Sequence, residues 1–98
     1  MKKLTTLVLS VFFLTTVAQT YKVKGRLIDE STNFAIPLAN IFLDSVFITS
    51  SDTSGNFAFL ASKGNHHLKF TAFGFEELIK NISVQKNTNL NITLKAED

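Results

Sequence analysis

Apolar and polar residues alternate with a period of two along most of the chain after residue 20. In the segment 21–28, Tyr21, Val23 and Leu27 fall on one face while lysine and arginine fall on the other, as in a half-buried β-strand. The alternation recurs in segments 38–44, 46–49, 57–61, 68–73, 78–84 and 89–94. Turn-forming residues separate these segments and no helical period is sustained, so the pattern predicts an all-β sandwich of six or seven short strands.

The same alternation predicts which side chains form the core. The inward positions are Tyr21, Val23, Gly25, Leu27, Ala39, Ile41, Leu43, Phe57, Phe59, Ala61, Leu68, Phe70, Ala72, Leu78, Ile82, Val84, Leu90, Ile92 and Leu94. Lys80 breaks the pattern in its segment, and we therefore expect a bulge or an irregular start of the strand there.

Residues 1–18 follow a different pattern. Two lysines precede an apolar run over residues 4–14, and small residues follow up to Ala18. This order is typical of a secretory signal peptide, and the run is too short to span a bilayer well. We expect cleavage before Gln19, which leaves residues 19–98 as one exported domain without a membrane span. A membrane anchor or a buried helix is the alternative interpretation.

Signal cleavage also changes the charge. The full chain has 10 Lys and Arg residues against 8 Asp and Glu residues, and both N-terminal lysines leave with the signal. The mature domain is then formally neutral, which gives no support for a nucleic acid partner or an anionic membrane.

Cysteine is absent, which excludes disulfides, a lipoprotein anchor and cysteine-based metal or redox sites. Stability must come from apolar burial and paired strands.

Three stretches carry a resemblance to a known family: VKGRLIDESTNFAIPLANIFL, TSSDTSGNFAF and HHLKFTAFGFEE. Together they resemble the carboxypeptidase regulatory-like domain, a small transthyretin-like sandwich. The positions that match the family pattern are Gly25, Leu27, Asp29, Pro37, Leu38, Asp52, Gly55, Phe57, Gly74 and Phe75. Two residues depart from it, because Asn40 stands where alanine is usual and Ser51 stands where threonine is usual.

The resemblance covers about residues 21–95 and implies an all-β, seven-stranded Greek-key β-sandwich of the transthyretin-like kind. It also implies an accessory role, since such domains occur beside carboxypeptidases and at the N-terminus of TonB-dependent outer-membrane receptors of Bacteroidetes. A shared fold does not carry an activity with it.

The stretch SDTSGNF, residues 51–57, permits two interpretations. A calcium loop would need several carboxylates at alternating positions, and only Asp52 is present. A hairpin turn needs only an Asp or Ser side chain to hold nearby backbone N–H groups and a glycine that accepts positive φ. We therefore expect Asp52 and Gly55, and likewise Gly74, to serve structural turns.

No catalytic, metal or cofactor site can be assembled from the sequence. His66 and His67 are adjacent, so on a strand they point to opposite faces and cannot share a metal ion; we expect solvated or strand-end histidines. The adjacent carboxylates Asp29 and Glu30, and likewise Glu76 and Glu77, also point apart on a strand, which does not suit a paired acid and base. A transthyretin-like hydrolase would need convergent His, Arg and Ser or Asp groups, and Arg26 is the sole arginine.

Outward aromatic residues are the more informative feature. Phe42 and Phe73 fall on the polar side of their segments, and Phe34 lies in a predicted loop. A cluster of exposed phenylalanines would form a docking surface for a partner, whereas single exposed residues need no explanation and a register slip would bury them.

These observations predict a non-enzymatic exported β-sandwich that binds another envelope protein or supports it structurally. Its expected location is the periplasm, the outer membrane or the medium. The alternative is the N-terminal extension of a TonB-dependent outer-membrane receptor, whose plug and barrel would follow the sequence given.

Overall fold

The computed structural model describes residues 19–98, so the predicted signal peptide lies outside the described part. The strands are β1 (Thr20–Asp29), β2 (Asn40–Leu43), β3 (Val46–Ser50), β4 (Asn56–Ser62), β5 (Gly64–Thr71), β6 (Leu78–Val84) and β7 (Thr88–Leu94). Between residues 19 and 98 there is no helix with the length and apolar character needed to cross a membrane.

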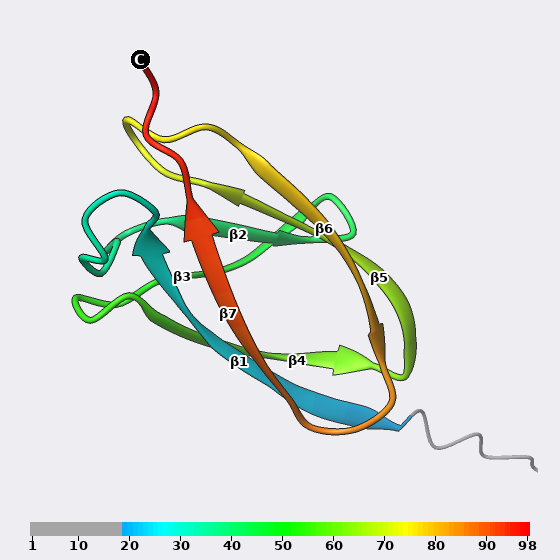
Figure 1. Cartoon of the computed structure of the whole chain (residues 1–98). Helices are drawn as coiled ribbons and strands as arrows, with labels where there is room; N and C mark the ends of the chain where they lie inside the picture. The colour runs from blue at the N-terminus through cyan, green and yellow to red at the C-terminus, as the bar shows by residue number, and fades with distance from the viewer. Residues whose placement is uncertain (1–18) are drawn as a thin grey trace, which may run out of the picture.

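The strands form two sheets that pack face to face (Figure 1). One sheet has the order β4-β1-β7 and the other has the order β3-β2-β5-β6. Only β2–β3 and β5–β6 are consecutive strands paired within one sheet; the other connections pass between the sheets. The predicted all-β, seven-stranded Greek-key sandwich is confirmed.

β1 is the central strand of its sheet and determines which segments meet. It pairs antiparallel with β4 and parallel with β7. Because β1 and β7 are parallel, both strands point to the same end of the molecule, where the C-terminus also lies (Figure 1). The loops that follow these two strands therefore meet at that end, which we call the loop end.

The core contains most of the residues that alternation predicted. The fully or nearly buried side chains are Val23, Leu27, Ile36, Ala39, Ile41, Phe57, Phe59, Ala61, Leu68, Phe70, Val84, Ile92 and Leu94. Phe57 of one sheet meets Phe70 of the other edge to face, with ring centroids 5.7 Å apart. Such aromatic pairs contribute about 0.5–1.5 kcal/mol beyond the area that they bury. This contact joins the two sheets.

Gly25 allows this aromatic contact to form at the centre of β1. A Cβ atom at residue 25 would lie 2.6 Å from the Phe57 ring and would overlap the carbonyl oxygen of Leu90. The missing side chain therefore makes room for the Phe57 ring and for β7 on its other side.

The expectation for β6 was partly wrong. The β5–β6 register runs without a shift, and Leu68 pairs with Lys80, so no bulge lies there. Lys80 sits at an inward position but reaches solvent, because β6 is the edge of its sheet. The start of β6 is irregular in another way, since an isolated bridge between Phe75 and Ala96 precedes it. The register shift of this sheet lies instead between Ile41 and Phe42 of β2.

Asp52 and Gly55 form the turn that connects β3 to β4. Asp52 Oδ1 accepts hydrogen bonds from the N–H groups of Ser54 (2.9 Å) and Asn56 (2.8 Å). Gly55 has a φ of 78° and donates its N–H to the carbonyl oxygen of Asp52. The turn is not a hairpin, because β3 and β4 belong to different sheets. It redirects the chain from one sheet to the other.

Gly55 and Gly74 give a matched pair of substitutions. Both have positive φ, 78° and 87°, but a Cβ at Gly55 would lie 2.5 Å from the Leu27 carbonyl oxygen, whereas a Cβ at Gly74 meets no atom within 4 Å. We expect Gly74→Val to lower the free energy of unfolding by about 1–3 kcal/mol through backbone strain alone. Gly55→Val should cost about 1–3 kcal/mol more through overlap. Urea denaturation measures both, and equal losses would contradict this assignment.

Candidate functional site

Two of the three predicted surface phenylalanines come together at the loop end. Phe34 is 74% exposed and Phe73 is fully exposed, and both line one cavity of about 360 Å³. Leu38, 79% exposed, lines the same cavity together with Pro37 and the half-buried Phe75. We call this feature, made by Phe34, Pro37, Leu38, Phe73 and Phe75, the apolar cleft.

The loop between β1 and β2 presents Phe34 through a compact turn. The Asp29 N–H donates to the Phe34 carbonyl oxygen, and the Asn33 N–H donates to the Asp29 carbonyl oxygen, both at 2.8 Å. The N–H and the hydroxyl of Ser31 both donate to Asp29 Oδ1 and hold the pKa of this carboxyl below its usual value. Asn33 has a φ of 62°, a conformation that asparagine tolerates better than most residues.

Leu38 is held in a conformation that its side chain disfavours. Its φ is 59°, and its N–H donates to the Ser51 carbonyl oxygen at 3.0 Å. The buried Ser51 hydroxyl donates to the Ile36 carbonyl oxygen (2.7 Å) and accepts the Ala39 N–H (2.9 Å). Positive φ in a branched apolar residue persists only where the surroundings impose it. Ser51 thus fixes the segment that presents Leu38, a role that the sequence did not reveal.

Phe73 lies beyond the end of β5, in a turn rather than on the strand. The Phe75 N–H donates to the Ala72 carbonyl oxygen, and Gly74 supplies the positive φ that closes the turn. The Gly74 carbonyl oxygen in turn accepts the Glu97 N–H at 2.9 Å. The turn is therefore anchored to the segment after β7.

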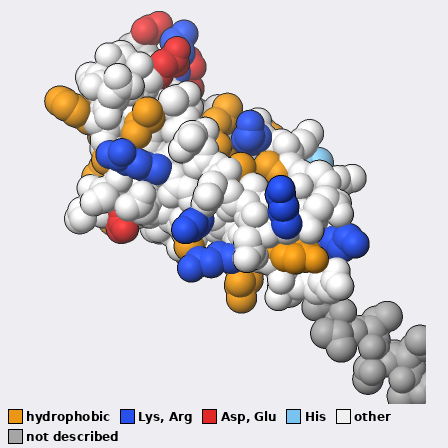
Figure 2. Space-filling view, turned by 60° about the horizontal axis from the view of Figure 1, so that its bottom comes forward, with side chains coloured by type: hydrophobic (Ala, Val, Ile, Leu, Met, Phe, Trp, Pro, Cys, Tyr) orange, Lys and Arg blue, Asp and Glu red, His pale blue; other side chains and the backbone are white. Residues whose placement is uncertain are grey.

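Acidic side chains gather around the apolar cleft. The residues that follow β1, precede β6 and follow β7 meet at the loop end, where the Glu30 N–H donates to Leu94 and the Glu76 N–H donates to Lys95. Six of the eight carboxylates of the chain lie in these segments or, for Asp29, at the last residue of β1: Asp29, Glu30, Glu76, Glu77, Glu97 and Asp98. Figure 2 shows acidic side chains gathered at one end of the molecule. The neutral domain therefore has a negative end.

Phe42 does not belong to the apolar cleft. It lies half-buried on the outer face of the four-stranded sheet, where its ring meets Phe47 edge to face at 5.9 Å. The Lys69 ammonium lies 4.6 Å from the Phe42 ring centroid, within the range of a cation–π contact. Phe42 points outward as alternation predicted, but its neighbours cover part of the ring.

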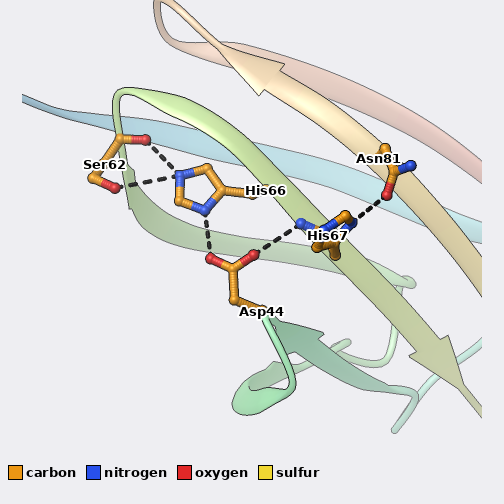
Figure 3. Close-up of polar contacts among 5 residues, drawn as sticks. All are labelled: Asp44, Ser62, His66, His67 and Asn81. Atoms are coloured by element: carbon orange, nitrogen blue, oxygen red, sulfur yellow. Dashed lines mark hydrogen bonds and ion pairs between the residues drawn. The ribbon is translucent and has the colours of Figure 1, made fainter.

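The expectation of a solvated histidine was wrong for His66. This residue is buried within β5, and its Nδ1 lies 2.6 Å from Asp44 Oδ2 (Figure 3). Its Nε2 lies 2.7 Å from the Ser62 carbonyl oxygen and 3.3 Å from the Ser62 hydroxyl. Asp44 also accepts the His67 N–H at 2.9 Å. The contact ties the β2–β3 turn, where Asp44 and Ser45 both have positive φ, to β5.

Asp44, His66 and Ser62 are the residue types of a hydrolytic triad, but their hydrogen bonds fit a structural role. An ionised carboxylate and a carbonyl oxygen only accept, so both contacts are satisfied when both His66 nitrogens donate, and the arrangement favours the protonated ring. The bond to Asp44, followed by the bond to the Ser62 carbonyl, raises the pKa of His66. A ring whose two nitrogens both hold protons has no lone pair with which to activate the serine.

His67 lies on the opposite face from His66, as predicted. It is exposed, and its Nδ1 contacts the side-chain oxygen of Asn81 on β6 (Figure 3). Among residues 19–98, no group of three or more His, Asp or Glu side chains is placed to hold a metal ion.

A family model described as the CarboxypepD_reg-like domain matches residues 23–98. No curated protein matches the sequence. The family description names a regulatory-like domain rather than a catalytic one.

Three solved structures share the fold. A DUF3823 family protein from Parabacteroides merdae has a TM-score of 0.65 and 15% identity, over 81% of this chain and 47% of its own. Hydroxyquinol 1,2-dioxygenase from Pseudomonas putida has a TM-score of 0.64 and 11% identity, and the match covers 85% of this chain and 58% of the dioxygenase chain. The minor pilin GBS52 from Streptococcus agalactiae has a TM-score of 0.56 and 16% identity, and the match covers 83% of this chain and 46% of the pilin chain.

At these identities the three likenesses show the fold alone. The chain spans about half the length of these solved structures.

The Asp44–His66 pair predicts a pH dependence of stability. The folded state raises the pKa of His66 above 6.5, so this contribution is complete below pH 6.5 and is lost as the pH rises through the folded pKa. Hydrogen bonds from the His67 N–H and from His66 lower the pKa of Asp44 below 3.8, so its contribution is complete above that pH and is lost in stronger acid. Both contributions are present between these two values.

Urea denaturation of the protein and of His66→Gln across about pH 5 to pH 9 checks this. The free energy of unfolding of the unchanged protein should fall above about pH 6.5, and His66→Gln should remove most of that decline. His67→Gln is the matched control, since His67 is exposed and its hydrogen bond to Asp44 comes from its backbone N–H. A decline that persists unchanged in His66→Gln would show that another group causes it.

Proposed function

Because the chain belongs to the carboxypeptidase regulatory-like domain family, we propose that it is a non-catalytic exported module that docks on another cell-envelope protein. The observation that carries this proposal is the apolar cleft, in which three large apolar side chains that are exposed within residues 19–98 line one cavity: Phe34, Leu38 and Phe73. A contiguous exposed apolar surface with a polar rim is typical of a protein interaction site.

The energetics of burial favour a partner at the cleft. Moving one large apolar side chain from water into an interface contributes about 1.5–3 kcal/mol. Hydrogen bonds already fix the backbone on both sides of the cleft, through Ser51 in one loop and Gly74 in the other. A partner therefore binds side chains whose supporting backbone needs little further ordering, which preserves more of the gain from burial.

The charge at the loop end defines the chemistry of the partner. Asp29 lines the cleft, and Glu76 and Glu77 directly follow the lining residue Phe75. Complementary charge speeds encounter and selects the register of binding. The best-fitting partner segment has an aromatic or aliphatic side chain for the cleft and lysine or arginine on either side of it.

The export part of the proposal is supported by the signal-like pattern of residues 1–18. The second candidate, the N-terminal extension of a TonB-dependent receptor, is compatible with the same fold and the same cleft. In that case the cleft would face a component that meets the receptor in the periplasm.

Docking is tested with two labelled peptides that differ only in flanking charge. One has a central Phe between two Arg residues, and the other has the same Phe between two Glu residues. We expect the first to shift the backbone amide NMR signals of the two loops around Phe34, Leu38 and Phe73. Phe73→Ser should weaken this binding about fivefold or more. Leu60→Ser is the matched control, because Leu60 is an exposed apolar residue on β4, away from the cleft.

Equal binding of the two peptides, or equal weakening in Leu60→Ser, would refute docking at the cleft. The thermal midpoint of each variant is measured in parallel. Both positions are exposed, so the fold should remain intact.

Export is tested by the mass of the protein recovered from the periplasm of an expressing Gram-negative cell. We expect an intact mass that corresponds to a chain starting at Gln19. Replacement of Ala18 by a bulky residue should block this processing. Recovery of the uncut chain in the cytoplasm would contradict export.

A further inference from the structure

A second surface, on the outer face of the three-stranded sheet, has the opposite charge. Lys22, Lys24 and Arg26 occupy every second position of β1 and line an open groove of about 840 Å³. In Figure 2, most of the visible lysine and arginine side chains are spread over the body of the molecule, whereas the acidic side chains gather mainly at one end. The formal neutrality of the domain therefore conceals two separated regions of opposite charge.

Carboxamides flank these cations on both neighbouring strands. Lys24 pairs in register with Asn89 of β7, and Arg26 pairs with Asn91 of β7 and with Asn56 of β4. All three asparagines line the groove and are exposed. Because a carboxamide both donates and accepts hydrogen bonds, the groove has a central row of charge between two rows of polar groups.

The three cations have no carboxylate partner in the described part of the chain, where the single ion pair joins Asp44 and His66. Asp52 contributes the one carboxylate of the lining, and its Oδ1 already accepts two backbone N–H groups. The Arg26 Nε donates to the Ser54 carbonyl oxygen at 3.2 Å, which orients the guanidinium at the wall of the groove. Its remaining N–H groups stay available to an anion.

The spacing of the charges identifies the kind of ligand. Alternate residues of a β-strand lie about 6.8 Å apart on one face, and an extended peptide has the same repeat. A peptide with Asp or Glu at every second position therefore places a carboxylate opposite each cation when it lies along β1. The lining has one aromatic residue, the buried Phe57, so there is no platform on which a sugar ring or a base could stack.

We propose that the groove over Lys22, Lys24 and Arg26 binds an extended acidic peptide segment in which carboxylates alternate with other residues. The flanking asparagines bond the backbone of this segment, and the cations pair with its side chains. This site is separate from the apolar cleft, and its ligand has the opposite charge from the segment that fits the cleft.

The test uses the purified protein and two labelled peptides of identical composition, measured by fluorescence anisotropy. One peptide has three Glu residues at alternate positions, and the other has the same three Glu residues in one block. We expect the alternating peptide to bind about fivefold tighter or more, because it alone matches all three cations at once. Its affinity should fall as salt is raised, since the contacts are exposed.

Variants locate the site. Lys24→Gln should weaken binding of the alternating peptide about twofold to fivefold, and the triple variant K22Q/K24Q/R26Q should weaken it about tenfold or more. Lys80→Gln is the matched control, because Lys80 is an exposed lysine on β6 of the other sheet and should leave the affinity unchanged.

Three results would each overturn the proposal. The first is equal affinity for the alternating and block peptides, and the second is an equal effect of Lys80→Gln and Lys24→Gln. The third is equally tight binding of a carboxylated polysaccharide, which would show a general attraction for polyanions. Circular dichroism of each variant confirms the fold, and the outward side chains of β1 are outside the core, so the substitutions should preserve it.

Discussion

The contact between Phe57 and Phe70 across the two sheets is the interaction on which the structure depends. With no cysteine in the chain, no disulfide holds the sheets together, so apolar burial must do so. The contact forms because Gly25 leaves space for the Phe57 ring beside β7. One glycine in the central strand thus determines how closely β1, β4 and β7 can assemble.

The parallel pairing of β1 with β7 then places the surfaces. It brings the loops after these strands to one end, where the apolar cleft and most of the carboxylates lie. The outward side chains of β1 form a basic row on the sheet face. A neutral domain therefore presents two chemically different surfaces. The buried Ser51 holds the segment that presents Leu38, and the buried His66 holds the β2–β3 turn, so we interpret their hydrogen bonds as structural rather than as catalytic machinery.

The sequence predicted the fold well because strand alternation is a local signal. The buried residues include four that the alternation of apolar and polar positions had placed on the inward face: Val23, Leu27, Phe57 and Phe59. Prediction failed where the partner was distant in sequence. His66 was expected to be a solvated or strand-end histidine. Its burial was missed because Asp44 lies 22 residues away in another strand connection, and nothing local shows that the two meet.

The candidate site could be predicted only in part. Phe34 and Phe73 were identified as outward aromatic residues, but alternation could not show that they share a cleft from which Phe42 is absent. Leu38 was assigned to the family pattern, and its exposure follows from a positive φ that a long-range hydrogen bond imposes.

By itself, the sequence determined which residues form strands, which faces are apolar and where the chain must turn. These properties depend on neighbours one or two positions away. The tertiary structure alone decided which loops meet, which charges separate and which polar groups are buried together. Those properties depend on strand order, because pairing between distant segments brings residues 39 positions apart, such as Phe34 and Phe73, to one cavity.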